Sequence, residues 1–457
     1  MRSLITHFNL WLSRNVFLLI VLAALHLLFF LLAMKYNHIA FSVDSVDYLH
    51  QATNLKAHGS WYAGDWDMPH DDTMYSRRPP LYAIFLFLIQ FISTNTFFAL
   101  AIQNIISVFS LILCCFLFWQ LTGIRPVKRW LALLPLLFFP TQFIYANMVM
   151  ADVLFQFFLI LALIFFHHSI RDAKAFLGFC ICIALAILTK PVLYLFSVAV
   201  PVIALLFYTK KIFHLREVLI SLLPLAVVIS MSAYNYHVTG YFHYSTVNEK
   251  YFSEYGAYLA VGERGNAVAQ AKIDSVVQVA RQQPDLKSYS DMLMRESFKL
   301  VKENKARFVW AQLKGMVYFF TDHGRFDLMA FFVNPDYVQE RGWKYYYAQN
   351  GISGVVDYVK TFNPMMVLYL GLTALFNIFI FYCLIRFLFA RNIAIPDRIV
   401  FLILIAYIVI FTGVVGCSRY RMAIFPILWM SYIWFLSARG KHATGETHSA
   451  ETPQATD

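Results

Sequence analysis

Residues 15–34 read NVFLLIVLAALHLLFFLLAM, an almost wholly apolar run with a single histidine in it. A helix rises about 1.5 Å per residue, so a run of this length covers the hydrocarbon core of a bilayer, which is about 30 Å thick. No small-residue cleavage site follows Met34, which distinguishes the run from a cleaved signal peptide. We therefore predict a retained membrane-spanning helix and take the bilayer as the main solvent of the chain.

Nine further apolar runs of similar length follow along the chain. They cover approximately residues 97–121, 130–146, 152–168, 174–190, 192–208, 215–236, 363–389, 398–416 and 420–437. The composition agrees, because 60% of the residues are hydrophobic and only 14% are charged, values that fit no soluble globular class. The expected fold class is an all-α polytopic membrane protein with ten full spans.

Short loops rich in lysine and arginine set the expected orientation. Four of them carry Arg125/Lys128/Arg129, Arg171/Lys174, Lys210/Lys211/Arg216 and Arg386/Arg391/Arg398. By the positive-inside rule these loops and both termini face the cytoplasm, which places loops 35–80 and 237–362 on the opposite side. The apolar stretch 79–93 would invert every later loop if it crossed the membrane. We therefore expect a juxtamembrane or re-entrant helix that begins at Pro79-Pro80, with an eleven-span count as the alternative.

The apolar runs divide the chain into four parts. These are an N-terminal transmembrane module at 1–236 that includes external loop 35–80, an external loop domain at 237–362, C-terminal transmembrane helices at 363–438 and a disordered cytoplasmic tail at 439–457. The first loop combines aspartates with aromatic residues, which is typical of a sugar-binding loop or of a solvated loop with an interfacial aromatic belt. In the second loop, 291–320 predicts one or two amphipathic helices, which belong to a small appended domain of mixed helix and turn or lie on anionic lipid.

The cysteines do not indicate a zinc site, and the net charge does not indicate binding of nucleic acid. The six cysteines lie within or beside apolar runs and lack the Cys/His spacing of a zinc site, so we expect them to pack in the core. The formal charge of +11 is spread over several short loops instead of one stripe. Membrane orientation therefore explains it better than binding of nucleic acid.

Several short motifs that combine charged, aromatic and proline residues occur one after another along the chain. Those of the first external loop are Asp44-Ser45-Val46-Asp47-Tyr48, Gly59-Ser60-Trp61 and Arg78-Pro79-Pro80-Leu81. They are followed by Met150-Ala151-Asp152-Val153-Leu154, by Leu188-Thr189-Lys190-Pro191, and by Arg419-Tyr420-Arg421 at the start of the last span. All fall on one face of the predicted topology. In this order they resemble the motifs of the GT-C glycosyltransferases of family 39, the protein O-mannosyltransferases and lipid A aminoarabinose transferases.

This resemblance implies the GT-C fold and a transferase that inverts the anomeric configuration. The donor would be a sugar on undecaprenyl or dolichyl phosphate, and the acceptor a protein, lipid A or another glycan. The resemblance also implies a periplasmic active site in a bacterial inner membrane. In keeping with a lipid-linked donor, the sequence contains no nucleotide-binding phosphate loop. A transporter or flippase of lipid-linked sugars, and a polysaccharide polymerase or ligase, are the alternatives.

Two aspartates are candidates for the catalytic roles. Asp44 is the expected general base, placed at the membrane surface where partial desolvation would raise its pKa toward a useful value. Asp152 lies at the outer edge of a span, where an ionisable side chain is costly and therefore points to function, such as orienting the acceptor or a cation. Each is alternatively a helix cap.

Five residues are candidates for binding the lipid phosphate: Arg78, Lys190, Arg419, Tyr420 and Arg421. Lys190 lies between apolar residues, where an ammonium group needs an anion. The two arginines around Tyr420 open a helix, where guanidinium groups and free backbone amides both suit a phosphate. Snorkelling to outer-leaflet head groups is the alternative. Arg77 is a possible helper beside Arg78.

The acidic pair of the motif family is incomplete here. The second acidic position is Ser45, a poor metal ligand, so a divalent metal stays open and no cofactor is assigned. Asp47 lies three positions from Asp44, close enough to substitute for the missing acid on a helical turn. We assign Asp47 and the neighbouring Tyr48 to donor or acceptor binding.

Overall fold

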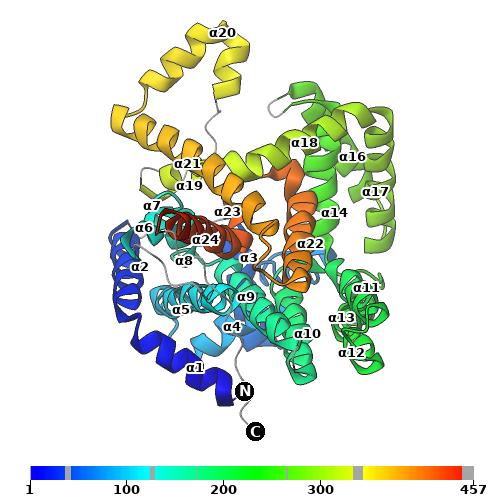
Figure 1. Ribbon diagram of the computed structural model, residues 1–457. Helices are drawn as coiled ribbons and strands as arrows, with labels where there is room; N and C mark the ends of the chain where they lie inside the picture. The colour runs from blue at the N-terminus through cyan, green and yellow to red at the C-terminus, as the bar shows by residue number, and fades with distance from the viewer. Residues whose placement is uncertain are drawn as a thin grey trace.

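The computed structural model describes residues 2–36, 43–123, 129–170, 172–263, 266–332 and 343–444. Within these ranges all regular structure is helical (Figure 1). Eight helices are long and apolar enough to cross a membrane, which confirms a multi-pass helical membrane protein. Four of them are single helices: α2 (Val16–Tyr36), α5 (Thr96–Thr122), α9 (Asp152–Ser169) and α21 (Pro364–Leu388).

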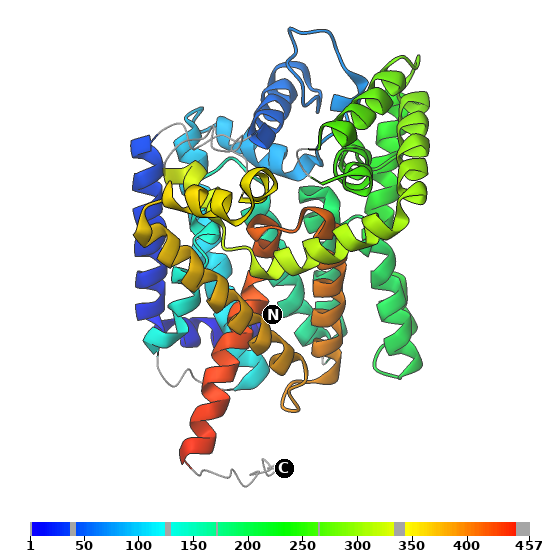
Figure 2. The same cartoon turned by 90° about the horizontal axis from the view of Figure 1, so that it is seen from above.

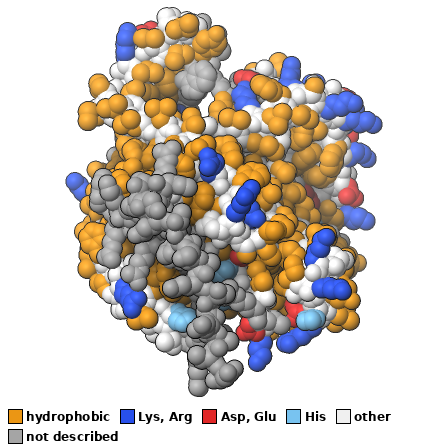
Figure 3. All heavy atoms as spheres, in the orientation of Figure 1, with side chains coloured by type: hydrophobic (Ala, Val, Ile, Leu, Met, Phe, Trp, Pro, Cys, Tyr) orange, Lys and Arg blue, Asp and Glu red, His pale blue; other side chains and the backbone are white. Residues whose placement is uncertain are grey.

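The other four spans each join two or more helical segments. They are η3–α11 (Pro191–Leu193 and Phe196–Thr209), α12–α13 (Leu215–Ile220 and Leu223–Thr239), α22–η6 (Ile395–Thr412 and Gly413–Val415) and α23–η7–α24 (Ser418–Arg421, Met422–Ile424 and Phe425–Thr444). Lipid-facing surfaces are evident on the outer helices. On α2, Ile20, Leu27 and Leu31 are each more than half exposed, and Figure 3 shows how much of the surface is hydrophobic. Such patches are stable only against lipid or another apolar partner.

Two apolar helices are shorter than a full span. The helix α10 (Ala173–Thr189) packs along α9, close to the predicted run 174–190. The helix α4 (Pro80–Gln90) begins directly after Pro79, as expected, because proline is favoured in the first helical turn. Its 11 residues cover only about 16 Å, which is too short to cross the hydrocarbon core.

The prediction of one spanning helix over 130–146 is wrong. This segment forms three short helices, α6 (Arg129–Ala132), α7 (Leu134–Leu137) and α8 (Thr141–Ala146). Two prolines explain the breaks, because a proline lacks a backbone N–H and its ring clashes with the preceding turn. Pro135 lies at the start of α7, and Pro140 is the residue just before α8. The expected ten full spans are therefore not all present as long helices.

The two segments predicted to be external, hereafter the external segments, are helical too. The first contains α3 (Val43–His58) and the short η2 (Asp72–Met74). The second contains α14 (Thr246–Tyr251), the π-helical η4 (Phe252–Ala257), α15 (Tyr258–Val261), α16 (Ala267–Arg281), α17 (Leu286–Glu303), α18 (Lys305–Thr321), α19 (Arg325–Phe332) and α20 (Trp343–Lys360). The amphipathic region predicted at 291–320 is thus two helices, α17 and α18. Figure 3 shows charged side chains of both signs over α16 and α17, as water-facing helices require.

Both ends of the chain are helical for some distance. The helix α1 (Arg2–Ser13) precedes α2, and α24 continues to Thr444. Residues 439–444, predicted to belong to a disordered tail, are helical, and the rest of that prediction lies outside the described residues.

The helix α18 crosses the corner between the last two spans at very close range (Figure 2). A Cβ atom placed on Gly315 would lie 1.5 Å from the carbonyl oxygen of Gly413, and one on Gly416 would lie 1.9 Å from the carbonyl oxygen of Gly315. Only glycine allows two backbones to approach in this way. The crossing fixes the corner that leads into α23.

Candidate functional site

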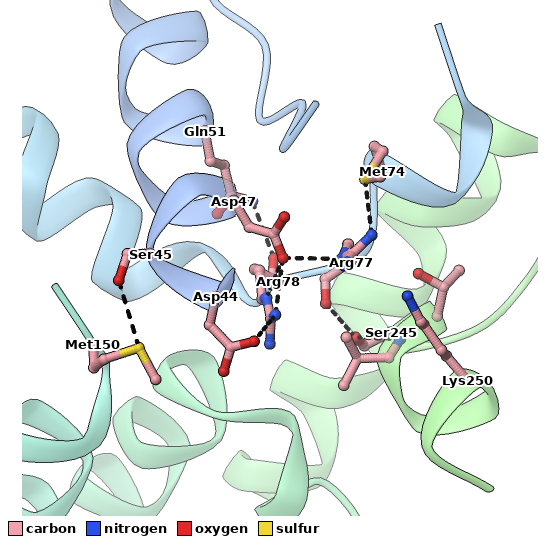
Figure 4. Close-up of polar contacts among 12 residues, drawn as sticks. Asp44, Ser45, Asp47, Gln51, Met74, Arg77, Arg78, Met150, Ser245 and Lys250 are labelled. Carbon is pink, nitrogen blue, oxygen red and sulfur yellow. Dashed lines mark hydrogen bonds and ion pairs between the residues drawn. The ribbon is translucent and has the colours of Figure 1, made fainter. Parts of the chain in front are cut away.

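The helix α3 brings two aspartates to one arginine (Figure 4). Asp44 and Asp47 are three residues apart and therefore share a face of the helix. Arg78, just before α4, lies with Nη2 2.7 Å from Asp44 Oδ1, and its Nε donates to Asp47 Oδ2 at 2.9 Å. Arg77 Nε is also 2.9 Å from Asp47 Oδ2. The first external loop thus forms a cluster of two acids and two guanidinium groups.

The second half of the site comes from the ends of membrane helices. Arg419 Nη2 donates to the other oxygen of Asp44, Oδ2, at 2.7 Å and lies 3.5 Å from Asp152 Oδ2. Lys190 Nζ donates to Asp152 Oδ1 at 2.6 Å. Acids and bases therefore alternate in one chain, hereafter the charged chain: Arg77, Asp47, Arg78, Asp44, Arg419, Asp152 and Lys190. It contains four cations and three carboxylates, so one positive charge is in excess.

Local backbone geometry explains how Lys190 and Asp152 meet. Lys190 ends α10 in an extended conformation (φ −140°, ψ 131°), which a following proline favours. Asp152 is the first residue of the neighbouring α9. The N-cap residue of α9 is Ala151, and no side chain caps this helix end. The carboxylate of Asp152 accepts a hydrogen bond from Lys190 instead. Both side chains are largely buried, where an unpaired charge would be costly.

Aromatic rings flank the cations. Arg78 lies 5.4 Å from the centre of the Tyr48 ring, and Tyr48 itself is buried. The Tyr420 ring lies 5.5 Å from Lys190 Nζ and 6.0 Å from the Arg419 guanidinium carbon. Cation–π contacts of this kind stabilise positive charge in a desolvated place. Tyr48 and Tyr420, both predicted site residues, therefore lie against the charged chain.

The pKa of Asp44 differs from the expectation. Burial acts to raise the pKa, but the charges and hydrogen bonds of Arg419 and Arg78 outweigh burial and hold the pKa well below its usual range. The predicted rise is therefore wrong for the resting site. Asp44 is a carboxylate, and each of its two oxygens accepts a hydrogen bond from an arginine.

Two residues of the predicted motifs lie apart from the charged chain. The guanidinium group of Arg421 donates to the backbone carbonyls of Phe320 at 2.7 Å and Asp322 at 2.6 Å, so it ties the end of α18 to α23. Ser45 is fully buried, and its hydroxyl points to Met150 Sδ at 3.9 Å. The structure brings Asp44, Asp47, Arg78, Asp152, Lys190 and Arg419 together but leaves these two outside.

A second acidic cluster, which the sequence analysis did not identify, lies behind Arg419. Asp327 accepts hydrogen bonds from the hydroxyls of Thr141, Tyr145 and Ser418 at 3.2, 3.0 and 2.5 Å. Burial raises the pKa of Asp327 to about 6. The Tyr145 ring in turn lies 5.7 Å from the Arg419 guanidinium carbon. Asp327 therefore holds Tyr145, whose ring faces Arg419, and Ser418, which precedes Arg419 in the chain. No sequence motif pointed to Asp327.

Asp322 completes this second cluster. Its Oδ2 accepts a hydrogen bond from the Ser418 backbone N–H at 2.7 Å. Burial opposes ionisation of Asp322, but hydrogen bonds from His323 and Ser418 and the charge of Arg421 lower its pKa to about 2. An anion at the first residue of α23 suits the positive end of a helix.

The two external segments pack on each other beside the charged chain. The Ser76 hydroxyl and His243 Nε2 are 2.5 Å apart. The hydroxyls of Ser245 and Thr246 donate to the backbone carbonyls of Arg77 and Thr73 at 2.9 and 2.8 Å. Residues from both segments thus contribute to one region, and Figure 4 shows Ser245 next to Arg77.

The donor set does not fit a divalent metal. Among the described residues there is no group of three histidine, cysteine or acidic side chains that could hold one. Asp44 and Asp47 share the guanidinium of Arg78, and Asp152 binds Lys190. A metal ion would have to displace these cations, and Ser45 faces a thioether instead of the acids.

Comparison of the chain with known proteins finds no matching family model, no matching curated protein and no matching solved structure.

Proposed function

We propose that this chain is an inverting GT-C glycosyltransferase that moves a sugar from a polyprenyl-phosphate donor to an acceptor hydroxyl on the non-cytoplasmic face of the membrane. The observation that supports this most is the charged chain at the ends of membrane-spanning helices, with its excess of one positive charge. A phosphate group held at the membrane surface by its lipid tail is the anion that such a place suits.

Arg419 is the cation best placed for the donor phosphate. It is the second residue of a membrane span, and it stands between the Asp44 and Asp152 carboxylates. Among the described residues its Nε is buried without a hydrogen-bond partner, and one Asp152 oxygen is in the same state. A buried donor without an acceptor is costly, and a bound phosphate oxygen would satisfy it.

The resting ion pairs give the donor a second role. Asp44 is a weak base while Arg78 and Arg419 each contact one of its oxygens at 2.7 Å, because both guanidinium groups stabilise the carboxylate. A donor phosphate competes with Asp44 for these same guanidinium groups. When the phosphate takes them, Asp44 loses the interactions that lower its pKa, and its carboxylate becomes a better base. Donor binding therefore precedes activation of the acceptor.

The transfer step then balances as follows. The acceptor hydroxyl gives its proton to Asp44 while its oxygen forms a bond to the anomeric carbon from the face opposite the phosphate. The bond between that carbon and the phosphate oxygen breaks, and its electron pair leaves with the polyprenyl phosphate. Arg78, Arg419 and Lys190 neutralise the charge that develops on the leaving phosphate. One displacement inverts the anomeric configuration.

Transport of a lipid-linked sugar fits the charge positions less well. Transporter sites lie near the middle of the membrane, often at interrupted helices. Here Asp152 is the first residue of α9, Lys190 directly follows α10, and Arg419 is the second residue of its span. The charges therefore gather at helix ends, where a substrate held in the outer leaflet meets water.

The direct test is release of the lipid product. The full chain, purified and reconstituted in lipid nanodiscs, is given undecaprenyl-phosphate-linked hexoses and pentoses with candidate acceptors, and free undecaprenyl phosphate is measured by mass spectrometry. We expect release by the native protein and loss of at least about 100-fold in Arg419→Ala and Lys190→Ala, since each removes a buried charged partner. Asp67→Asn, an exposed acid in the same external segment, serves as the control that keeps activity. Full activity in both cation variants would refute the proposal.

A further inference from the structure

The external helices enclose a groove that the charged chain does not use. Its volume is about 460 Å³, within the range of small-molecule sites in proteins. Residues of η4, α15 and α16 line it: Glu254, Tyr255, Tyr258, Gln270, Ile273, Asp274, Val277, Gln278 and Arg281. Those from α16 lie 3, 4, 7, 8 and 11 positions after Gln270, so they form a single helical face.

The groove has an apolar floor and a polar rim. Tyr258 and Ile273 are buried and belong to a small core with Ala257 and Ala269, which makes the floor rigid. The rim carries two carboxylates, two amides and one guanidinium, and the Gln270 amide donates to Asp274 Oδ1 at 2.9 Å. The Tyr255 side chain is 38% exposed at the edge of the groove. The floor therefore offers apolar contact, and the rim offers both donors and acceptors.

This chemistry suits a saccharide better than a phosphate. Sugar rings present C–H faces that pack on an aromatic ring and pairs of hydroxyls that bond to carboxylates, amides and guanidinium groups. Glu254 and Asp274 outnumber Arg281, so the charge of the rim is −1 when all three are ionised. Lys250 Nζ lies 3.6 Å from Glu254 Oε1 and offsets this charge, so the rim is close to neutral, which suits a neutral glycan better than an anionic donor.

A nearly continuous helical segment links the groove to the charged chain. At its start, the Ser245 hydroxyl holds the backbone of Arg77. Midway, the Tyr251 hydroxyl donates to the Thr412 carbonyl at 3.3 Å, and the Tyr251 and Tyr255 rings are 5.4 Å apart. Ser245 and Tyr258 are thirteen positions apart, which corresponds to roughly 20 Å along a helix. The groove lies at the end of this segment that is remote from Arg77, so one extended molecule could reach both the groove and the charged chain.

We infer that this groove is a remote binding site for a glycan acceptor, holding units of the chain beyond the one that receives the new sugar. The role as acceptor site rests on the proposed function, whereas saccharide binding itself does not. Binding energy gained far from the reacting hydroxyl would select long glycans over short ones.

Binding is tested on the full chain in nanodiscs with neutral hexasaccharides of glucose, mannose and N-acetylglucosamine, by saturation-transfer NMR and calorimetry. We expect at least one of them to bind, and Tyr255→Ala to weaken binding about tenfold or more, with Tyr255→Phe retaining it because the ring face is kept. Tyr347→Ala is the matched control, because Tyr347 is an exposed tyrosine on α20 of the same external region. A serine- and threonine-rich peptide is tested in parallel.

Several results would overturn the inference. They are a native protein that binds none of the hexasaccharides, equal losses in the Tyr255→Ala and Tyr347→Ala proteins, and binding of the peptide in place of the sugars. Kinetics separate this inference from the proposed function. Tyr255→Ala should raise KM for a long glycan acceptor and leave turnover of a short one unchanged. Absence of donor turnover in the native protein would refute the transferase but not the saccharide groove.

Discussion

Asp44 connects the two halves of the charged chain, because one of its oxygens meets Arg78 of the external segment and the other meets Arg419 of the last span. An acid in this position competes directly with any anion that the two arginines bind. Its removal should therefore affect catalysis and donor binding in opposite directions, which is unusual for a residue that contacts the substrate.

Asp44→Asn should abolish sugar transfer and yet tighten the binding of undecaprenyl phosphate by about tenfold. Hydrogen bonds to charged groups are worth about 1.5–3 kcal/mol, and the neutral amide competes for the guanidinium groups less strongly than the carboxylate. Binding is measured by native mass spectrometry or calorimetry in nanodiscs, with Asp67→Asn as the control. Unchanged or weaker binding in Asp44→Asn would rule out the competition, and no binding to the native protein would rule out the donor class.

Asp327 gives a pH dependence of stability that can be assigned to one group. Burial raises its pKa from 3.8 in the unfolded chain to about 6, so the folded protein binds the proton more tightly. Its favourable contribution is complete below about pH 4 and is lost as pH rises toward 6, on the order of 3 kcal/mol in all. Asp322, whose pKa is lowered to about 2, acts in the opposite direction and only below about pH 4.

The measurement is the melting temperature of the solubilised protein between pH 4.5 and 7. The native protein should lose stability across this range, and Asp327→Asn should flatten that dependence. Burial also raises the pKa of Glu249, but this residue is present in both proteins and cancels in the comparison. Identical pH profiles would show that Asp327 does not titrate as inferred.

The sequence identified some residues of the charged chain and its surroundings but not others. Asp152, Lys190 and Arg419 stand out in the sequence as charges at the edges of apolar runs, whereas Asp44 was singled out by the order of the short motifs. Asp327 could not be predicted, because it lies in a long polar loop where one more acid carries no signal. Its importance comes from burial against Ser418, 91 residues away. The pKa of Asp44 was mispredicted because desolvation is visible in a sequence while the two arginine partners are not.

Among the elements, α18 determines how the corner before α23 is placed. Its backbone touches that of Gly413 and Gly416 through Gly315, without room for a side chain. The same helix ends at Thr321, and the carbonyl of Phe320 in its last turn accepts a hydrogen bond from Arg421. Displacement of α18 would therefore move α23 and, with it, Arg419.

Gly315→Ala should lower the melting temperature by at least about 4 °C and weaken undecaprenyl phosphate binding, because neither backbone at the crossing can yield. Gly371→Ala is the matched control, since Gly371 also lies within a helix but has nothing within 4 Å of its added Cβ. That control should be neutral or slightly stabilising, as alanine favours helix more than glycine. Equal behaviour of the two variants would contradict the tight crossing.

Proline limited the prediction of helix length in one segment, although α11 continues through Pro201. Some long apolar runs, such as the one that forms α2, became single helices, and others join two or more helical segments. Segment 130–146 has the same apolar character, but Pro135 and Pro140 divide it, and a count of apolar residues ignores them. The crossing at Gly315 was equally invisible, since close approach of two backbones depends on partners about a hundred residues apart.

For the molecule as a whole, the positive-inside rule predicts that the charged chain and the groove lie on the same, non-cytoplasmic side of the membrane. Labelling with a membrane-impermeant maleimide tests this. Lys287→Cys, exposed on α17, should react from outside intact spheroplasts, whereas Lys210→Cys, exposed after α11, should react only after permeabilisation. Of the native cysteines, five are buried and one is half-buried, so background labelling should be low. The reverse pattern would invert the topology.

The charged chain also has a consequence for how the protein is made. Asp152 and Lys190 are only 38 residues apart and Asp44 and Arg78 only 34, so these pairs can form soon after each segment leaves the ribosome. Together with Arg77 and Asp47, these two pairs contain three acids and three bases, so their net charge is zero. Arg419 pairs with Asp44 across 375 residues and arrives with the last span. Before the last span is made, the site therefore has no net charge. Only a protein synthesised to its final helix acquires the excess positive charge that attracts an anion.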